Sequence, residues 1–167
     1  WMAHRGNQKY EETVQAHHTA LTAAGYGVDI IDQLCDLSPY KAVIAPMAYL
    51  IRADFAERLT AFAAAGGLVY LTYLSGYVDE ENLRYVTTPP LEALTGLRTD
   101  EIDAFTQGHE NHFLWLGRKW PVKEMAQLST PKGAQVLATY QQQFYQGQPV
   151  LTRNAVGQGV CYTLQAR

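Results

Sequence analysis

Three side chains in this sequence have the chemistry of a covalent nucleophile: Ser75, Cys35 and Cys161. Ser75 follows an apolar run at residues 68–73, and hydrolases place a nucleophilic serine at such a strand end, in a sharp turn framed by glycines. Ser75 lacks these flanking glycines, because Tyr73 occupies the position of the first glycine in the pattern. Cys35 falls in a loop and Cys161 in a strand, and none of the three has an evident histidine partner. We therefore predict no catalytic nucleophile.

Paired carboxylates are the next candidates, because two of them can act as a general acid and a general base. Five candidates lie in two polar segments of the chain: Asp79, Glu80, Glu81, Glu101 and Asp103. Charged side chains are mostly exposed unless they are paired. We expect these five to be loop and surface groups and predict no catalytic residue among them.

Histidines could ligate a metal ion, and His109 and His112 have the i, i+3 spacing of a ligand pair in the segment His109-Glu110-Asn111-His112. A zinc site would need at least a third ligand and supporting contacts. His17 and His18 are adjacent, so on a helix they point about 100° apart and do not chelate together. We predict no metal site.

Glycine pairs and aromatic side chains complete the candidates. Gly25-x-Gly27 and Gly157-x-Gly159 are too short to cradle a phosphate, and turns are their ordinary use, so no cofactor is predicted. Eleven Tyr and three Trp could stack on sugars. They could equally fill a core or a subunit interface, where aromatic residues are enriched.

Composition excludes several classes of protein. The 167 residues suit one domain, with 47% hydrophobic and 17% charged residues and a net charge of −3. Basic residues are scattered, which argues against a nucleic-acid surface. No apolar run reaches the ~18 residues of a membrane span. Two distant cysteines make no disulfide framework and indicate a reducing compartment.

The first half of the chain reads as alternating helices and strands. A helix is predicted near residues 10–24, and strands at 28–31, 41–45 and 68–73. Between the last two, Phe55, Leu59, Phe62 and Ala63 lie on one face of a helix that Gly66 and the next glycine close. This strand–helix–strand unit predicts a crossover, and the apolar run at 68–73 a central strand covered on both faces.

The second half is less regular. We expect a loop at 77–84, a short helix that begins near Pro89 and ends at Gly96, and an irregular acidic stretch at 100–111. Strands are predicted at residues 113–116, 136–140, 149–153 and 160–164, the last two joined by a hairpin turn at 154–159. The fold class is α/β, with a mostly parallel sheet and a C-terminal antiparallel hairpin.

The order of short motifs resembles one family. Residues 25–82 contain VDII, DLS, VIAP, GG, LTY and VDEEN in sequence, and residues 138–159 contain ATY, FYQGQP, TRN and GQG. No single motif is specific, but their spacing over nearly the whole chain resembles the middle domain of bacterial β-galactosidases of glycoside hydrolase family forty-two.

The resemblance implies a fold like that of class I glutamine amidotransferases, a flavodoxin-like three-layer sandwich. It also implies a domain through which three subunits associate. The catalytic (β/α)₈ barrel needs about 250 residues, so it and both catalytic glutamates are expected upstream of Trp1. We expect residues 1–167 to be one domain excised from a longer chain and lacking its first strand, which the family places before a Trp-containing segment.

We therefore predict a non-catalytic oligomerisation domain of a cytoplasmic β-galactosidase whose parent hydrolyses terminal β-D-galactosides. Its partners would be two further copies, in a homotrimer, and the parent's catalytic barrel. Two alternatives stay open. One is a small glutamine amidotransferase-like hydrolase that uses Ser75 or a cysteine. The other is a carbohydrate-binding module that uses exposed aromatic residues.

Overall fold

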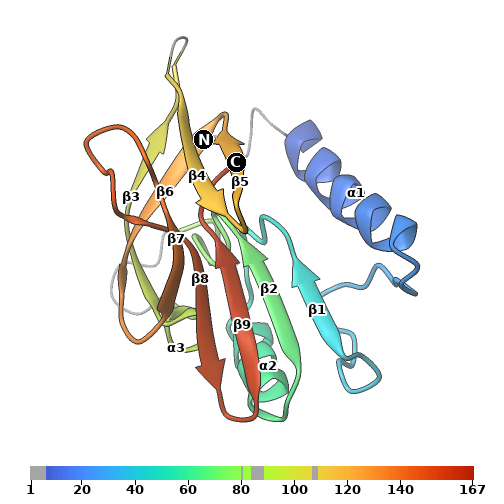
Figure 1. The fold of residues 1–167 in the computed structure, drawn as a ribbon. Helices are drawn as coiled ribbons and strands as arrows, with labels where there is room; N and C mark the ends of the chain where they lie inside the picture. Colours follow the sequence, from blue (N-terminus) through green and yellow to red (C-terminus); the bar gives the residue numbers. More distant parts are fainter. Residues whose placement is uncertain (1–6, 80, 84–88, 107–108) are drawn as a thin grey trace.

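The computed structural model describes residues 7–79, 81–83, 89–106 and 109–167 (Figure 1). Its helices are α1 (Asn7–Ala23), α2 (Ala53–Ala64) and α3 (Glu92–Thr95). Its strands are β1 (Ala42–Ala45), β2 (Leu68–Thr72), β3 (Leu97–Ala104), β4 (Asn111–Trp115), β5 (Arg118–Val122), β6 (Met125–Pro131), β7 (Gln135–Thr139), β8 (Pro149–Val156) and β9 (Gly159–Leu164).

The main sheet has five strands in the order β1-β2-β9-β8-β7. β1 pairs with β2 and β2 with β9 in parallel, whereas β8 is antiparallel to β9 and to β7. The predicted β1–α2–β2 unit and the predicted β8–β9 hairpin are both confirmed. The predicted central position of the 68–73 run is confirmed as well, since β2 has a strand on each side.

One core lies between α2 and this sheet. Phe55, Leu59 and Ala63 recur on one face of α2 and are buried against Val69 and Leu71 of β2. Burying a side chain such as leucine stabilises a fold by roughly 1.5–3 kcal/mol, so this stripe is what fixes α2 to the sheet. The helix ends before a glycine, as predicted, because Gly66 adopts a φ of +111° that other residues disfavour.

A second core lies under the C-terminal half, where the two-stranded sheets β3–β6 and β4–β5 meet β7 and β8. Tyr140 is completely buried there, and its hydroxyl donates to the carbonyls of Gln127 and Gln165 at 3.3 and 2.5 Å. The ring of Tyr145 meets the ring of Tyr140 edge-on at 5.2 Å. Burial raises the pKa of the Tyr145 hydroxyl to about 12.

Two predicted segments were wrong. Residues 28–31 belong to no strand of the described chain, and Ile30 is 75% exposed, so this segment lacks the paired neighbour that a strand needs. Residues 100–104 belong to β3 instead of an irregular stretch, and Asn111 begins β4. The acidic side chains of β3 are tolerated because this strand pairs with β6 alone and leaves an edge open to solvent. Residues 107–108 lie outside the described chain.

Helix α1 lies on the other face of the main sheet from α2. Tyr70 alternates with Val69 and Leu71 along β2, so its ring points to the opposite face, where it meets the ring of His17 on α1 at 5.9 Å. The predicted helix stop at Gly25 is confirmed by a φ of +85°. Among the described residues, no helix has the length and apolarity to cross a membrane.

Candidate binding groove

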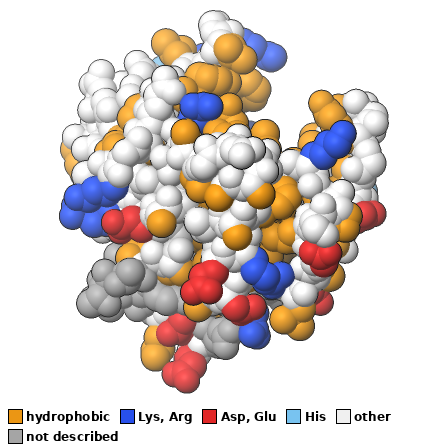
Figure 2. All heavy atoms as spheres, turned by 90° about the horizontal axis from the view of Figure 1, so that it is seen from below, with side chains coloured by type: hydrophobic (Ala, Val, Ile, Leu, Met, Phe, Trp, Pro, Cys, Tyr) orange, Lys and Arg blue, Asp and Glu red, His pale blue; other side chains and the backbone are white. Residues whose placement is uncertain are grey.

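A groove of about 910 Å³ lies between α1, residues 28–34 and β1. Figure 2 shows it as a hollow between α1, on the right, and the body of the molecule, with hydrophobic side chains along it. Its apolar lining includes Val14, Leu21, Val28, Ile31, Ile44 and Phe55. A concave, mostly apolar cavity of this size is where a binding site is expected by default.

The α1 wall is held by few side-chain contacts. Besides the contact between His17 and Tyr70, the hydroxyl of Thr13 lies 3.3 Å from that of Tyr73. The Nδ1 atom of His17 is 2.7 Å from the carbonyl oxygen of Thr13, which fixes the orientation of its ring. Burial raises the pKa of the Tyr70 hydroxyl to about 12, so this tyrosine stays neutral at physiological pH.

Salt bridges tie the start of α1 to the C-terminal half. Lys9 Nζ lies 2.6 Å from Glu124 Oε2, and Arg167 reaches both Glu12, at 3.7 Å, and Glu124, at 3.4 Å. All but the Arg167 side chain are well exposed, and exposed ion pairs contribute at most about 1 kcal/mol each. The α1 wall is therefore attached more weakly than α2.

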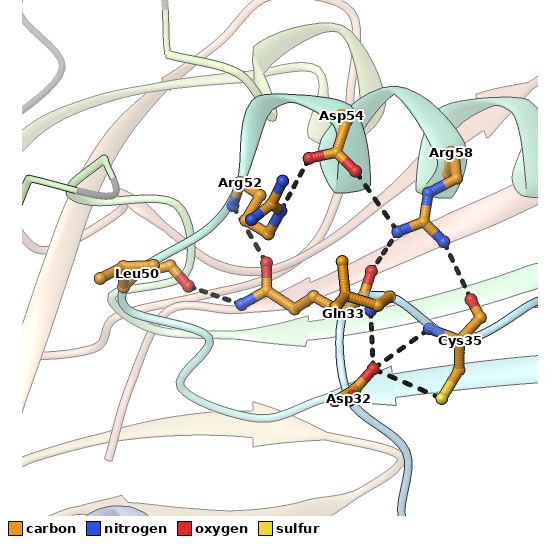
Figure 3. Close-up of polar contacts among 8 residues, drawn as sticks. Asp32, Gln33, Cys35, Leu50, Arg52, Asp54 and Arg58 are labelled. Carbon is orange, nitrogen blue, oxygen red and sulfur yellow. Dashed lines mark hydrogen bonds and ion pairs between the residues drawn. The ribbon is translucent and has the colours of Figure 1, made fainter.

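The opposite wall is fastened to the start of α2 by a polar network (Figure 3). The guanidinium of Arg58 donates to the carbonyl oxygens of Gln33 and Cys35, the latter at 2.9 Å. The side chain of Gln33 donates to Leu50 O at 3.1 Å and accepts from Arg52 N at 3.0 Å. Residues 33–35 are thus bonded to α2 and to the loop that precedes it.

Carboxylates stabilise both ends of this network. Asp54 accepts from Arg52 at 2.9 Å and lies 3.6 Å from Arg58, one helical turn away. Asp32 caps the turn at the other end, where its Oδ1 accepts from the amides of Leu34 and Cys35 at 2.7 and 3.1 Å. These bonds, chiefly the one from Leu34, lower the pKa of Asp32.

The three predicted nucleophile candidates do not converge. The hydroxyl of Ser75 accepts from Ala48 N at 3.2 Å and lies 3.5 Å from Ala45 O, so it bonds to main chain and not to a histidine. The Sγ of Cys35 lies 3.4 Å from Asp32 Oδ1 at the groove's polar wall. Cys161 is buried in the α2 core, and this burial raises the pKa of its thiol to about 12.

The carboxylate candidates are spread over separate elements. Asp79 accepts from the amides of Glu81 and Leu83 at 2.9 Å, which is a turn-stabilising role. Glu101 and Asp103 are on β3, with Glu101 exposed and Asp103 half-buried. Glu80 lies outside the described residues.

The histidine candidates also have local partners. His109 stacks on Phe105 at 5.6 Å, and His112 Nδ1 lies 3.1 Å from the side-chain oxygen of Gln142. His18 lines the groove beside His17. In the described chain no three His, Cys, Asp or Glu side chains gather closely enough to hold a metal ion.

The glycine pairs occupy turns. Gly157, at a φ of +57°, lies in the β8–β9 hairpin, and a Cβ on Gly159 would stand 2.2 Å from Gly67 O and 2.3 Å from Ala63 O. Gly159 is therefore required for the hairpin to approach the end of α2. Around Gly27 a Cβ would meet no heavy atom within 4 Å.

Sequence patterns did not single out three residues that hold the walls of the groove: Gln33, Arg58 and Tyr70. Gln33 and Arg58 are ordinary polar residues in a loop and a helix, and the one local pattern that could have pointed to them is the i, i+4 spacing of Asp54 and Arg58. Tyr70 carried none, because an aromatic residue in an apolar strand is expected in any core. Their roles depend on which elements become neighbours.

Comparison with known proteins supplies the family. Residues 2–166 match the family described as the β-galactosidase trimerisation domain. The chain is 38% identical over 167 residues to β-galactosidase BglY of Alicyclobacillus acidocaldarius, covering 95% of this chain and 24% of that protein. It is 35% identical to GanA of Bacillus subtilis, with 98% and 25% covered.

Solved structures agree. The β-galactosidase of Rahnella sp. R3 superimposes with a TM-score of 0.90 at 36% identity, over 95% of this chain and 25% of that one. That of Bacillus circulans sp. alkalophilus gives 0.88 at 35% identity, over 94% and 24%. The chain spans about a quarter of each of these relatives. It belongs to the β-galactosidase trimerisation domain family.

Proposed function

We propose that this chain is the assembly part of a larger β-galactosidase, that it performs no catalysis itself, and that three copies associate in a closed ring. The observation that carries the proposal is the family match over residues 2–166, in a chain that spans 24% of its relative BglY. The catalytic barrel and its two glutamates then belong to the remainder of the parent chain, which would act on terminal β-D-galactosides.

A ring of three copies uses one heterologous contact three times, and a contact of this kind buries apolar surface. The hairpin β4–β5 and the loop after β7 expose large apolar side chains: Leu114, Leu116, Trp120 and Phe144. Leu116 is 80% and Phe144 78% exposed. Such side chains supply surface that assembly can cover.

We also propose a cytoplasmic location and a glutamine amidotransferase-like fold. Free cysteines at positions 35 and 161 support the first, since disulfides are rare in reducing compartments. The β1–α2–β2 crossover and the parallel pairing of β9 support the second, because strands linked by helices are the basis of flavodoxin-like sandwiches.

Assembly is tested on the full-length parent protein with and without residues 2–166. Size-exclusion chromatography with light scattering should give a trimer for the full-length protein and a smaller species for the deletion variant. Circular dichroism checks that the remainder stays folded. A folded deletion variant that still forms trimers would place assembly elsewhere in the parent.

Catalysis is tested on the 167-residue chain with a chromogenic β-galactoside. No turnover is expected, because the elements of the described residues form no (β/α)₈ barrel. Turnover that keeps constant specific activity through purification to homogeneity would contradict the proposal.

A further inference from the structure

The β4–β5 hairpin ends in a turn whose sequence does not suit its backbone. The two turn residues, Leu116 and Gly117, have φ values of +50° and +72°. In a two-residue turn with both φ values positive, Asn followed by Gly is preferred, because a bulkier side chain crowds the backbone there. Leu116 is nevertheless 80% exposed, so packing within the described chain does little to offset this local strain. The side chain of Leu116 is therefore placed for a contact outside its own chain.

Basic and apolar side chains surround this turn. Leu114 and Lys119 are cross-strand partners, so they lie on the same face of the hairpin, and both are exposed. On the other face the core stops short of the tip, where Trp120 is exposed and the guanidinium of Arg118 lies 5.2 Å from the centre of its ring. The hairpin contains no Asp or Glu. Its free end is therefore an apolar surface with two positive charges.

The segment between α1 and β1, residues 26–36, has the opposite charge. It contains no Lys or Arg, and it exposes three apolar side chains and three carboxylates: Tyr26, Ile30, Leu34, Asp29, Asp32 and Asp36. Hydrogen bonds from Leu34 and Ser38 lower the pKa values of Asp32 and Asp36 respectively, so both are charged at neutral pH. Figure 1 shows this segment at the lower right and β4 and β5 in the upper half, so the two surfaces lie apart on one chain.

We infer that the end of the β4–β5 hairpin docks on residues 26–36 of a neighbouring copy, and that this contact, repeated three times, closes the ring. The inference rests on the proposed function and names the surfaces that would meet. A ring with threefold symmetry joins two different surfaces of the chain, one toward each neighbour. This pair meets that requirement, because apolar side chains face apolar ones while Arg118 and Lys119 face carboxylates.

Two other contacts of the hairpin fit less well. Two hairpins docked on each other would place Arg118 and Lys119 of one copy near the same residues of the other, and like charges repel across an interface. Strand β3 also presents carboxylates, but Leu97 is buried and Ile102 half-buried, so it offers little apolar surface. Residues 26–36 offer both kinds of side chain.

The test follows the exchange of subunits between trimers of the full-length parent protein that carry a donor or an acceptor fluorophore. Interface mutations act mainly on the rate of dissociation, so exchange reports on the contact however tight the trimer is. Leu116→Asn should speed exchange about tenfold or more, because it removes an apolar anchor from the contact. Asn suits the positive φ, so the variant should keep its fold. Leu83→Asn removes an exposed leucine outside both surfaces and is the matched control.

The facing surface is tested in the same way. Ile30→Asn should speed exchange by a similar factor, since Ile30 is exposed at the centre of the acidic segment. In one chain, Leu116→Asn and Ile30→Asn should together speed exchange by less than the product of their separate effects, because both remove the same contact. Far-UV circular dichroism checks that each variant is folded.

Charge reversal tests the pairing of signs. Lys119→Glu and Asp29→Lys should each speed exchange about threefold. A chain with both changes should return toward the unmodified rate, because opposite charges again face each other. Lys132→Glu, between β6 and β7, makes the same charge change outside the hairpin and should leave the rate unchanged.

A trimer whose exchange rate is unchanged by Leu116→Asn or by Ile30→Asn would overturn the inference and leave the proposed function intact. Separate effects that multiply in full would also overturn it, because the two surfaces would then not meet. The same holds if the chain with both charge changes exchanges faster than either single variant. A parent protein that forms no trimer would contradict the proposed function and the inference with it.

Discussion

The two faces of the main sheet carry helices that are attached in different ways. On one face, Leu59 of α2 is completely buried against Val69, within a continuous apolar core. On the other, α1 meets the sheet through the rings of His17 and Tyr70 and leaves a groove of about 910 Å³. The α2 side of the sheet, called the closed face below, is therefore filled by packed side chains, whereas the α1 side, called the open face, contains an unfilled groove.

The largest effect should come from the closed face. Leu59→Ala should lower the free energy of unfolding by about 2–5 kcal/mol, since Leu59 is 0% exposed and the cavity left would lie in a packed core. The same change at Leu21 on α1, which is only half-buried beside the groove, should cost below about 1 kcal/mol. Urea denaturation measures both. Equal losses would show that the two faces are packed alike.

A smaller effect is expected where the hairpin meets the end of α2. Gly159→Ala should destabilise the fold by about 1–3 kcal/mol, because its Cβ would overlap the carbonyl oxygens of Ala63 and Gly67. Gly27→Ala, on the groove side, meets open space and should be nearly neutral. Thermal unfolding of the two variants compares them directly. A neutral Gly159→Ala would mean that the approach is looser than the structure has it.

Arg58 joins the two regions, and its loss should act locally. Arg58→Ala should destabilise by about 1–2 kcal/mol, because it removes charged donors to two carbonyl oxygens of the groove wall. Amide exchange at residues 33–35 should rise more than exchange in β2. Arg98→Ala, which removes an exposed pair with Asp100, is the matched control and should change stability little. Uniformly faster exchange throughout the chain would contradict a local role.

The reactivity of the two free cysteines compares the two regions without a mutation, because Cys35 lies near the groove and Cys161 in the core beneath α2. Iodoacetamide at pH 8 should modify Cys35 slowly and leave Cys161 unmodified until the protein unfolds, because burial keeps the Cys161 thiol protonated. Burial raises the pKa of the Cys161 thiol from 9.0 to about 12 in the folded protein. The buried, protonated thiol therefore contributes fully to the free energy of unfolding below pH 9, and this contribution is lost as the pH rises toward 12. Rapid stoichiometric labelling of either cysteine in the folded state would favour the hydrolase alternative.

Sequence patterns predicted the closed face well and the open face poorly. The spacing of Phe55, Leu59 and Ala63 identifies a helix face, and the β-branched run at β2 identifies a buried strand, because both signals are local. Residues 28–31 show the same β-branched signal, yet they pair with no strand of the described chain, and a strand needs such a partner. In β3 the opposite occurs. Its acidic sequence does not predict a strand, yet the segment forms one because it pairs with β6.

Local sequence patterns could not predict the groove either, because it also depends on which segments become neighbours. The groove arises from a free edge of β1, from a loop fixed by Gln33 and Arg58, and from a helix that stands off the sheet. Each depends on contacts between segments distant in the sequence. The strands β5 and β6 were not predicted either, since Lys119, Trp120 and Pro121 give β5 no alternating apolar pattern.

Sedimentation equilibrium of the 167-residue chain, over a hundredfold range of concentration, tests most directly the claim that it serves assembly. The account predicts association that grows with concentration and a trimer as the closed form, because a heterologous contact repeated three times closes a ring. A strict monomer at every concentration would show that this domain is not sufficient for assembly. A stable dimer would contradict the threefold ring.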